Sequence, residues 1–295
     1  MKHIFIVNPA AGKGRPLKLI PDIRRYCEEQ NCPYEIIVTE YPGHATEIAA
    51  AKSAEDRCRI YSVGGDGTLN EVLNGMAGSG SSLAVIPSGS GNDFIKSLIG
   101  RDVPGDIIPA TIRGTERLID YGSVNDKYFI NIASVGFDAK VAYQTELFKK
   151  MPLVSGKAAY ILGILNTIII RSNEHIELKL DDRVISGETL LVAAGIGKYY
   201  GGGIKALPDA VIDDGLFDVC HVEGVPRLKI LRLFPQYIKG LHGSIEGVHF
   251  YRSRRVEITA KKPIPLNRDG EIVLASKAVF EIFPKSLPFV VPDFG

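Results

Sequence analysis

Hydrophobic residues in the first 120 positions form two alternating patterns, short apolar runs and segments with helical spacing. Strands and helices are predicted in the order Ile4–Val7, Leu17–Gln30, Tyr34–Thr39, Ala45–Ser53, Ile60–Val63, Thr68–Met76 and Leu83–Ile86, beginning with a strand. Strands that alternate with helices favour right-handed βαβ crossovers and a mostly parallel sheet. The first part of the chain therefore predicts an α/β domain.

From about Tyr121 the pattern changes to short β-rich runs separated by turn residues. The predicted strands are Lys127–Ala133, Ile176–Leu180, Leu190–Gly195, Phe217–His221, Arg255–Ala260, Ile272–Ala275 and Ala278–Ile282. Two segments with helical spacing, Lys157–Arg171 and Arg227–Leu241, interrupt them. This pattern is typical of an antiparallel sandwich or barrel-like domain. We expect an α/β domain over residues 1–125, with a tail at about 286–295, and a β-rich sandwich domain over residues 126–285.

Composition narrows the class of protein. The chain has 295 residues, 45% of them hydrophobic, and a formal net charge of +1, which does not favour a nucleic-acid partner. The four cysteines form no CxxC pair, and the N-terminus enters a strand directly, so we expect a cytoplasmic protein. The longest apolar stretch, Ala158–Ile170, is too short to span a bilayer.

Three glycine-rich segments each follow a predicted strand. They are NPAAGKG at 8–14, VGGDG at 63–67 and PSGSGND at 87–93. In parallel sheets, ligands bind beyond the carboxyl ends of the strands, so we expect the three segments to cluster there. Glycines allow a ligand to approach the backbone closely, and together the segments favour a phosphate site.

The segment GGDGTLNE, residues 64–71, also carries a carboxylate. Thr68 and Glu71 fit a capping box, which predicts a helix start and free N–H groups for an anion. Asp66 would repel a phosphate unless a cation lies between them, which favours a magnesium ion. A tight turn with a solvated aspartate remains the alternative. Neither a GxxxxGK[ST] nor a GxGxxG motif is present.

GGDGTLNEVLNG, followed by PSGSGNDF, resembles the catalytic domain of diacylglycerol kinases, and most closely the soluble bacterial lipid kinase (diacylglycerol/YegS-like) branch. The similarity continues in LIDYGSVN at 118–125, FINIASVGFDA at 129–139, YYGGGIKALPDAVIDDGLFDV at 199–219 and NRDGEIV at 267–273. It implies a Rossmann-like first domain, similar to phosphofructokinases and NAD kinases, and a β-rich second domain. It also implies that ATP binds between the domains and that its phosphoryl group passes to a lipid hydroxyl.

The resemblance also implies roles for particular residues. The nucleotide would be bound by Asn8, Thr39, Gly64, Gly65, Asp66, Gly67, Thr68, Leu69, Asn70, Glu71, Ser90 and Asn92. Mg²⁺ would be bound by Asp214 and by the carbonyls of Val211 and Leu216, with Asp213 as the adjacent alternative. Glu271 would be the general base, assisted by Asp66. Asp93, Asp120 and Asp213 would complete an acidic network, because such carboxylates can converge only around shared cations or protons.

Two helical segments are candidates for lipid contact. Lys157–Arg171 is predicted as a packed helix, or as one wall of an acyl-chain groove. The segment Arg227–His242 mixes basic and apolar residues around Pro235, which should break the helix. Its pattern fits either a solvated face or contact with an anionic membrane, on the inner face of the plasma membrane. Related kinases also suggest a homodimer, which nothing in this chain supports by itself.

Three functions remain open from the sequence. The first is an ATP- and Mg²⁺-dependent lipid kinase, with diacylglycerol as the default lipid. The second is an NAD kinase, because that class shares the GGDG loop, although GNDF, DDGLFD and the late DGE favour the lipid kinases. The third is a catalytically silent nucleotide-binding regulatory protein.

Overall fold

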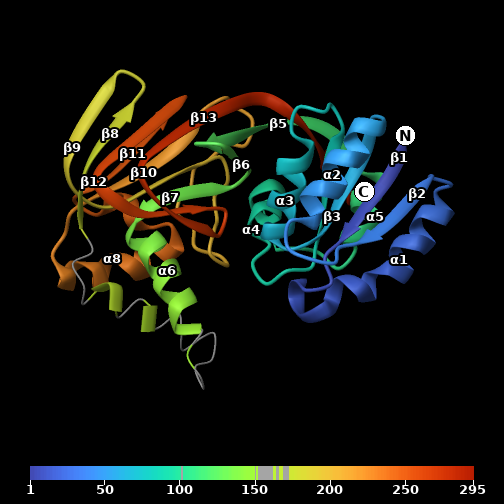
Figure 1. The fold of residues 1–295 in the computed structure, drawn as a ribbon, viewed down its shortest axis with the longest axis horizontal. Helices are drawn as coiled ribbons and strands as arrows, with labels where there is room; N and C mark the ends of the chain where they lie inside the picture. Colours follow the sequence, from blue (N-terminus) through green and yellow to red (C-terminus); the bar gives the residue numbers. More distant parts are fainter. Residues whose placement is uncertain (101, 150, 152–161, 164–165, 169–172) are drawn as a thin grey trace.

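The computed structural model describes residues 1–295 except 101, 150, 152–161, 164–165 and 169–172. Figure 1 shows two lobes that are joined by long strands. The elements of the first lobe are β1 (Lys2–Val7), η1 (Ala11–Gly14), α1 (Arg15–Glu29), β2 (Tyr34–Val38), α2 (His44–Glu55), β3 (Cys58–Gly64), α3 (Asp66–Met76), β4 (Ser82–Pro87), α4 (Asp93–Ile99) and α5 (Ile107–Arg113). Strands and helices alternate here as the sequence predicts.

Four strands of the first lobe pair in parallel, in the order β2-β1-β3-β4. Alternate side chains of these strands point to opposite faces of the sheet. Ile4 and Ile6 pack in a core with residues of α2 and α3, whereas Phe5 and Val7 pack with residues of α1 and α5. Burial on both faces explains why the strands are continuous apolar runs.

The second lobe is mostly antiparallel. Its elements are β5 (Thr115–Val124), β6 (Lys127–Phe129), β7 (Ile132–Gly136), α6 (Phe137–Lys149), β8 (Glu174–Leu180), β9 (Arg183–Gly195), β10 (Phe217–Glu223), α8 (Arg227–Lys239), η2 (His242–Ser244), β11 (Val248–Ser253), β12 (Arg255–Arg268) and β13 (Glu271–Val291). Strand order runs β11-β10-β9-β7-β12-β13 and continues into β4 of the first lobe. The parallel pair Phe289 and Leu83 makes that connection.

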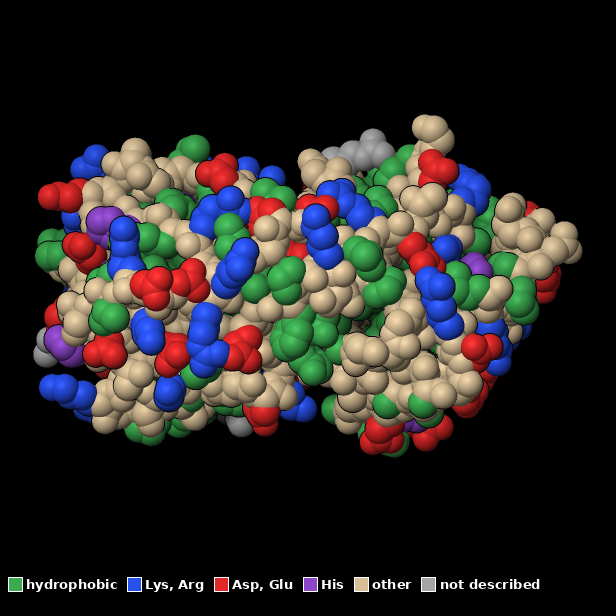
Figure 2. All heavy atoms as spheres, turned by 90° about the horizontal axis from the view of Figure 1, so that it is seen from above, with side chains coloured by type: hydrophobic (Ala, Val, Ile, Leu, Met, Phe, Trp, Pro, Cys, Tyr) green, Lys and Arg blue, Asp and Glu red, His purple; other side chains and the backbone are tan. Residues whose placement is uncertain are grey.

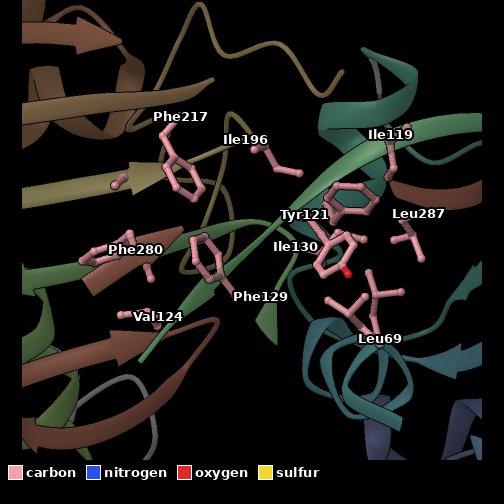
Figure 3. Close-up of a cluster of buried hydrophobic side chains, with 14 of the residues drawn as sticks. Leu69, Ile119, Tyr121, Val124, Phe129, Ile130, Ile196, Phe217, Phe280 and Leu287 are labelled. Atoms are coloured by element: carbon pink, nitrogen blue, oxygen red, sulfur yellow. The ribbon is translucent and has the colours of Figure 1, made fainter. Parts of the chain in front are cut away.

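One hydrophobic core extends through both lobes. Phe129, Phe217 and Phe280 lie together in the second lobe, with ring centroids 5.7 to 6.4 Å apart. Figure 3 shows Leu69 of α3 beside Ile130, close to Tyr121, at the junction of the lobes. The lobes are therefore joined by buried apolar surface as well as by shared strands.

Several element boundaries differ from the sequence prediction. Lys127–Ala133 is divided between β6 and β7, while the two predicted strands Ile272–Ala275 and Ala278–Ile282 are one strand, β13. The helix at Pro235 is not broken: α8 continues through it. Pro235 is on the exposed side of α8, where water can bond the carbonyl left without a partner, and Ile230, Leu233 and Tyr237 bury the opposite side. The predicted helix Lys157–Arg171 lies largely outside the described residues.

The capping box predicted at Thr68 and Glu71 is wrong. Helix α3 begins two residues earlier, at Asp66, after Gly65 in an extended conformation. Thr68 is therefore inside the helix and buried, and its Oγ1 accepts a hydrogen bond of 2.9 Å from Asn8 Nδ2. Contact with another loop, rather than capping, accounts for this threonine.

Candidate functional site

The three glycine-rich segments meet at the carboxyl ends of β1, β3 and β4, as the sequence predicts. The N–H groups of Ser88 and Gly89 donate to the Gly64 carbonyl, at 2.8 and 3.1 Å. A Cβ on Gly89 would lie 2.4 Å from Gly65 Cα, and one on Gly12 would lie 1.8 Å from the Ser88 carbonyl oxygen. The loops are packed so closely that only glycine fits at these contacts.

Asp66 caps the neighbouring helix. Its Oδ1 accepts hydrogen bonds from the N–H groups of Asp93 and Phe94, at 2.9 and 3.2 Å, which are the first groups of α4. Such bonds satisfy N–H groups that a helix start leaves without partners. The aspartate in the glycine loop therefore has a structural role, and the two donors compensate part of its charge.

Asp93 connects the first lobe to the second. Its Oδ2 accepts a hydrogen bond of 2.7 Å from the Gly202 N–H. Burial raises the pKa of the Asp93 carboxyl, and the nearby Asp66 carboxylate raises it further. Within the described part of the chain, the buried Oδ1 of Asp93 has no hydrogen-bond partner. A proton or a ligand donor can be accommodated at this oxygen.

Asp269 is a third carboxylate at the junction, on a half-buried residue that was not among the residues singled out from the sequence. It accepts hydrogen bonds from the Ile130 and Ile132 N–H groups at 2.9 and 3.1 Å, and from Asn70 Nδ2 at 2.9 Å. Burial raises its pKa to about 6, and the Asp66 carboxylate adds to the increase. The available signal was the Asp-Gly pair in NRDGEIV, typical of a two-residue hairpin turn. Both residues have positive φ.

Glu271, the predicted general base, lies two residues further at the start of β13. Its side chain is 65% exposed and lies 3.8 Å from the Arg268 guanidinium. Residues 269 and 271 thus share a turn but differ in environment. Asp269 is directed into the junction, while Glu271 is accessible to a substrate.

The predicted nucleotide-binding residues divide into two groups. Asn8, Thr39 and Glu71 line one cavity with about 520 Å³ of empty space, and Ser90 is exposed on its loop. The Leu69 side chain is instead buried in the core, and the Asn70 amide bonds Asp269. Leu69 and Asn70 can therefore bind a nucleotide only through their backbone groups. Asn92 orders its own loop, because its Oδ1 accepts from the Gly89 N–H at 3.0 Å.

The carboxylates of the predicted metal site are bound to other groups of the protein in this structure. Asp214 pairs with Arg252, and Asp213 pairs with Arg117. Asp120 is fully buried, and its two oxygens accept from the N–H groups of Gly215 and Lys285, both at 2.7 Å. Among the described residues, no three His, Cys, Asp or Glu side chains are grouped so that they could hold a metal ion. The predicted site would use only one such side chain, Asp214, with the carbonyls of Val211 and Leu216. Arginines and backbone donors compensate these carboxylates here, and Mg²⁺ binding at Val211, Asp214 and Leu216 stays a prediction through which no step is derived.

The predicted acidic residues therefore form two separate groups. Asp66 and Asp93 lie with Asp269 at the lobe junction, whereas Asp213 and Asp214 lie in the loop before β10, and Asp120 of β5 binds that loop through the Gly215 N–H. Asp66 and Asp214 were predicted from the sequence to belong to one acidic set. Their hydrogen bonds and ion pairs instead connect them to different partners.

Helix α8 has a polar and apolar surface that is not covered by the described residues. Leu228 is 81% exposed and Leu231 is 56% exposed, and Arg227, Lys229 and Arg232 lie among them. In the part of the chain that is described, no helix is both long enough and apolar enough to cross a bilayer. Elsewhere on the surface, in the view of Figure 2, acidic and basic side chains are interspersed.

Comparisons with known proteins place both lobes among kinases. The family described as diacylglycerol kinase catalytic domain matches residues 2–124, and the family described as YegS C-terminal NAD kinase beta sandwich-like domain matches residues 131–291. A Staphylococcus saprophyticus protein named diacylglycerol kinase is 32% identical over 272 residues, covering 90% of this chain and 88% of that protein. A Bacillus subtilis protein with the same name is 30% identical over 273 residues, with 90% and 88% coverage.

Solved structures show the same fold. A crystal structure described as a diacylglycerol kinase from Bacillus anthracis superposes with a TM-score of 0.72 at 20% identity, covering 98% of this chain and 96% of that one. Another Bacillus anthracis structure superposes with a TM-score of 0.77 at 24% identity, covering 98% and 97%. The mixed α/β lobe and the sheet-rich second lobe are thus common to these proteins.

Proposed function

This chain belongs to the diacylglycerol kinase family, and we propose that it transfers the γ-phosphoryl group of ATP to the hydroxyl of diacylglycerol. Membership of this family makes it a lipid kinase. In this proposal ATP binds as its Mg²⁺ complex, so the magnesium ion is part of the substrate. The resemblance of the first lobe to Rossmann-like nucleotide-binding domains is part of the same proposal.

The observation that carries the proposal is the meeting of three glycine loops with three carboxylates at one place. The loops offer backbone N–H groups at the start of α3, where the helix dipole favours phosphate. Asp66 is tolerated beside a phosphate because two N–H donors already bind its Oδ1. The cavity lined by Asn8, Thr39 and Glu71 then suits the rest of the nucleotide.

Phosphoryl transfer to an alcohol also needs a group that accepts the hydroxyl proton. We assign this role to Glu271, which is exposed, and we assign the orientation of the hydroxyl to Asp66. Asp269 holds the turn that carries Glu271 by bonding the Ile130 and Ile132 N–H groups. Asp269 is a positioning residue in this scheme.

The Glu271 assignment is tested with labelled ATP and diacylglycerol in mixed micelles. We expect wild-type protein to form labelled phosphatidic acid and Glu271→Gln to form it about 10² to 10⁴ times more slowly, the usual contribution of a general base. The control is Glu246→Gln, because the Glu246 side chain is 96% exposed and distant in sequence from the loops. Near wild-type turnover by Glu271→Gln would assign the proton to another group.

We also propose that the protein reaches its lipid by peripheral contact with the inner face of the plasma membrane. The exposed leucines of α8 suit the acyl boundary, and the basic residues beside them suit anionic headgroups. This arrangement favours a lipid substrate over NAD, the alternative acceptor.

A further inference from the structure

An apolar cavity lies inside the second lobe, between α6, β9 and α8. It holds about 620 Å³ of empty space, a figure that includes open solvent at its mouth. Its apolar wall includes Phe137, Val141, Leu191, Ile230, Leu233 and Phe234. The rings of Phe137 and Phe234 lie edge to face, 6.1 Å apart, across the contact of α6 with α8. Figure 1 shows these two helices on the same side of the lobe.

The polar side chains in the wall already have partners. Asp138 accepts from the Ala139 N–H at 2.8 Å and from the Tyr200 hydroxyl, and the hydroxyls of Tyr200 and Tyr237 lie 3.1 Å apart. Asn267 Oδ1 accepts from the Gly270 N–H at 2.8 Å. A sugar or a nucleotide would lose its hydrogen bonds to water here and gain few from the wall. A hydrocarbon has no hydrogen bonds to water to lose. The wall therefore selects an apolar occupant.

Two segments connect the cavity wall to the carboxylates at the lobe junction. Gly201 lines the cavity, and the next residue, Gly202, donates its N–H to Asp93 at 2.7 Å. Asn267, near the end of β12, also lines the cavity. Its Oδ1 accepts the hydrogen bond from the Gly270 N–H in the turn that contains Asp269. The cavity wall is thus one residue from the Gly202 N–H that binds Asp93, and on β12 it is two residues from Asp269.

We propose that this cavity binds one fatty acyl chain of the lipid substrate, with the glycerol end directed past Gly201 and Asn267 toward Asp66 and Glu271. The assignment rests on the proposed lipid kinase function and identifies where that substrate is held. Each additional methylene that enters the cavity strengthens binding about fourfold, which corresponds to about 0.8 kcal/mol. Substrate preference should therefore rise with acyl length until the cavity is filled.

A fluorescence experiment tests the occupant without using turnover. The chain contains no tryptophan, so Phe234→Trp introduces a single reporter into the cavity wall. We expect vesicles that contain diacylglycerol with brominated acyl chains to quench this tryptophan, because bromine quenches only at contact. The matched control is Tyr26→Trp, also half-buried but on α1 in the first lobe. Quenching of both reporters to the same extent, or of neither, would overturn the proposal.

A second variant narrows the cavity. We expect Ala142→Phe on α6 to reduce the quenching of the Phe234→Trp reporter at least tenfold, and to shift the preference of the kinase toward short-chain diacylglycerol with the KM for ATP unchanged. The control is Ala51→Phe at an exposed position of α2. Unchanged long-chain quenching by a folded Ala142→Phe protein would contradict the proposal.

The two hypotheses fail in different ways. Selective quenching of the cavity reporter in a protein that phosphorylates no diacylglycerol would support the acyl site and reject the proposed kinase substrate. Phosphorylation of long-chain diacylglycerol by a protein whose cavity reporter is not quenched would support the function and reject the acyl site.

Discussion

Asp66 contributes both to the proposed chemistry of the site and to the stability of the fold. One of its oxygens caps α4 through the Asp93 and Phe94 N–H groups, while its charge lies beside the glycine loops. An asparagine at this position keeps one oxygen as the acceptor and removes the charge. An alanine removes both.

These two substitutions separate the roles of Asp66. We expect Asp66→Asn to lower the rate of phosphoryl transfer at least 10²-fold with nearly unchanged stability, because the cap remains. Asp66→Ala should lose the same activity and also about 1 kcal/mol of stability, the usual cost of a lost cap. Steady-state kinetics and urea unfolding measure the two effects. Equal stabilities for the Asn and Ala variants would show that the cap contributes nothing.

Asp218 provides a pH-dependent test away from the proposed site. Burial raises its pKa to about 6, against about 3.9 for an unfolded aspartate. The folded protein thus keeps a proton that the unfolded chain releases, so this contribution to stability is complete below pH 4 and is lost as the pH rises to about 6. Asp218→Asn cannot titrate.

We therefore expect the stability of the wild type, relative to Asp218→Asn, to fall by about 1–2 kcal/mol between pH 4 and pH 7. Urea unfolding at several pH values gives this difference directly. A relative stability that rises over the same interval would mean that the nearby Arg252 guanidinium, 3.9 Å away, outweighs burial.

At the scale of elements, the sequence predicts helices, strands and loops best where their positions depend on the local pattern of residues. The glycine segments follow apolar runs, so their meeting at one sheet edge could be inferred from strand order alone. The start of α3 could not be inferred in this way, because the contact between Asn8 and Thr68 is tertiary. Similarly, Pro235 predicts a break, but burial of one face of α8 keeps that helix intact.

The exposed leucines of α8 are predicted to contribute to membrane binding. In co-sedimentation with anionic vesicles, we expect the double variant Leu228→Ser, Leu231→Ser to reduce membrane binding at least tenfold, because two leucines lose about 1.5–3 kcal/mol each when fully withdrawn from an apolar phase. Leu118→Ser is the control, since Leu118 is 52% exposed on β5. Binding to anionic and neutral vesicles that is equal and negligible for the wild type would contradict membrane contact by this helix.

At the scale of the whole molecule, function depends on contacts between residues far apart in the chain. Asn70 and Asp269 bond across the lobes, as do Gly202 and Asp93. The family motif drew attention to Glu271, but which carboxyl of the DGE turn is buried depends on how β13 crosses between the lobes. Likewise, the pairing of Asp213 and Asp214 with arginines from distant strands could not be inferred from DDGLF.

The central claim is that this assembly phosphorylates a lipid hydroxyl. The most direct measurement supplies wild-type protein with labelled MgATP and offers diacylglycerol and NAD together, followed by separation of the lipid and aqueous products. We predict that the label appears in phosphatidic acid and not in NADP, and that triacylglycerol, which lacks a free hydroxyl, receives none. Label in NADP alone would identify an NAD kinase, and binding of ATP without transfer to any acceptor would identify a regulatory protein; either result would contradict the claim.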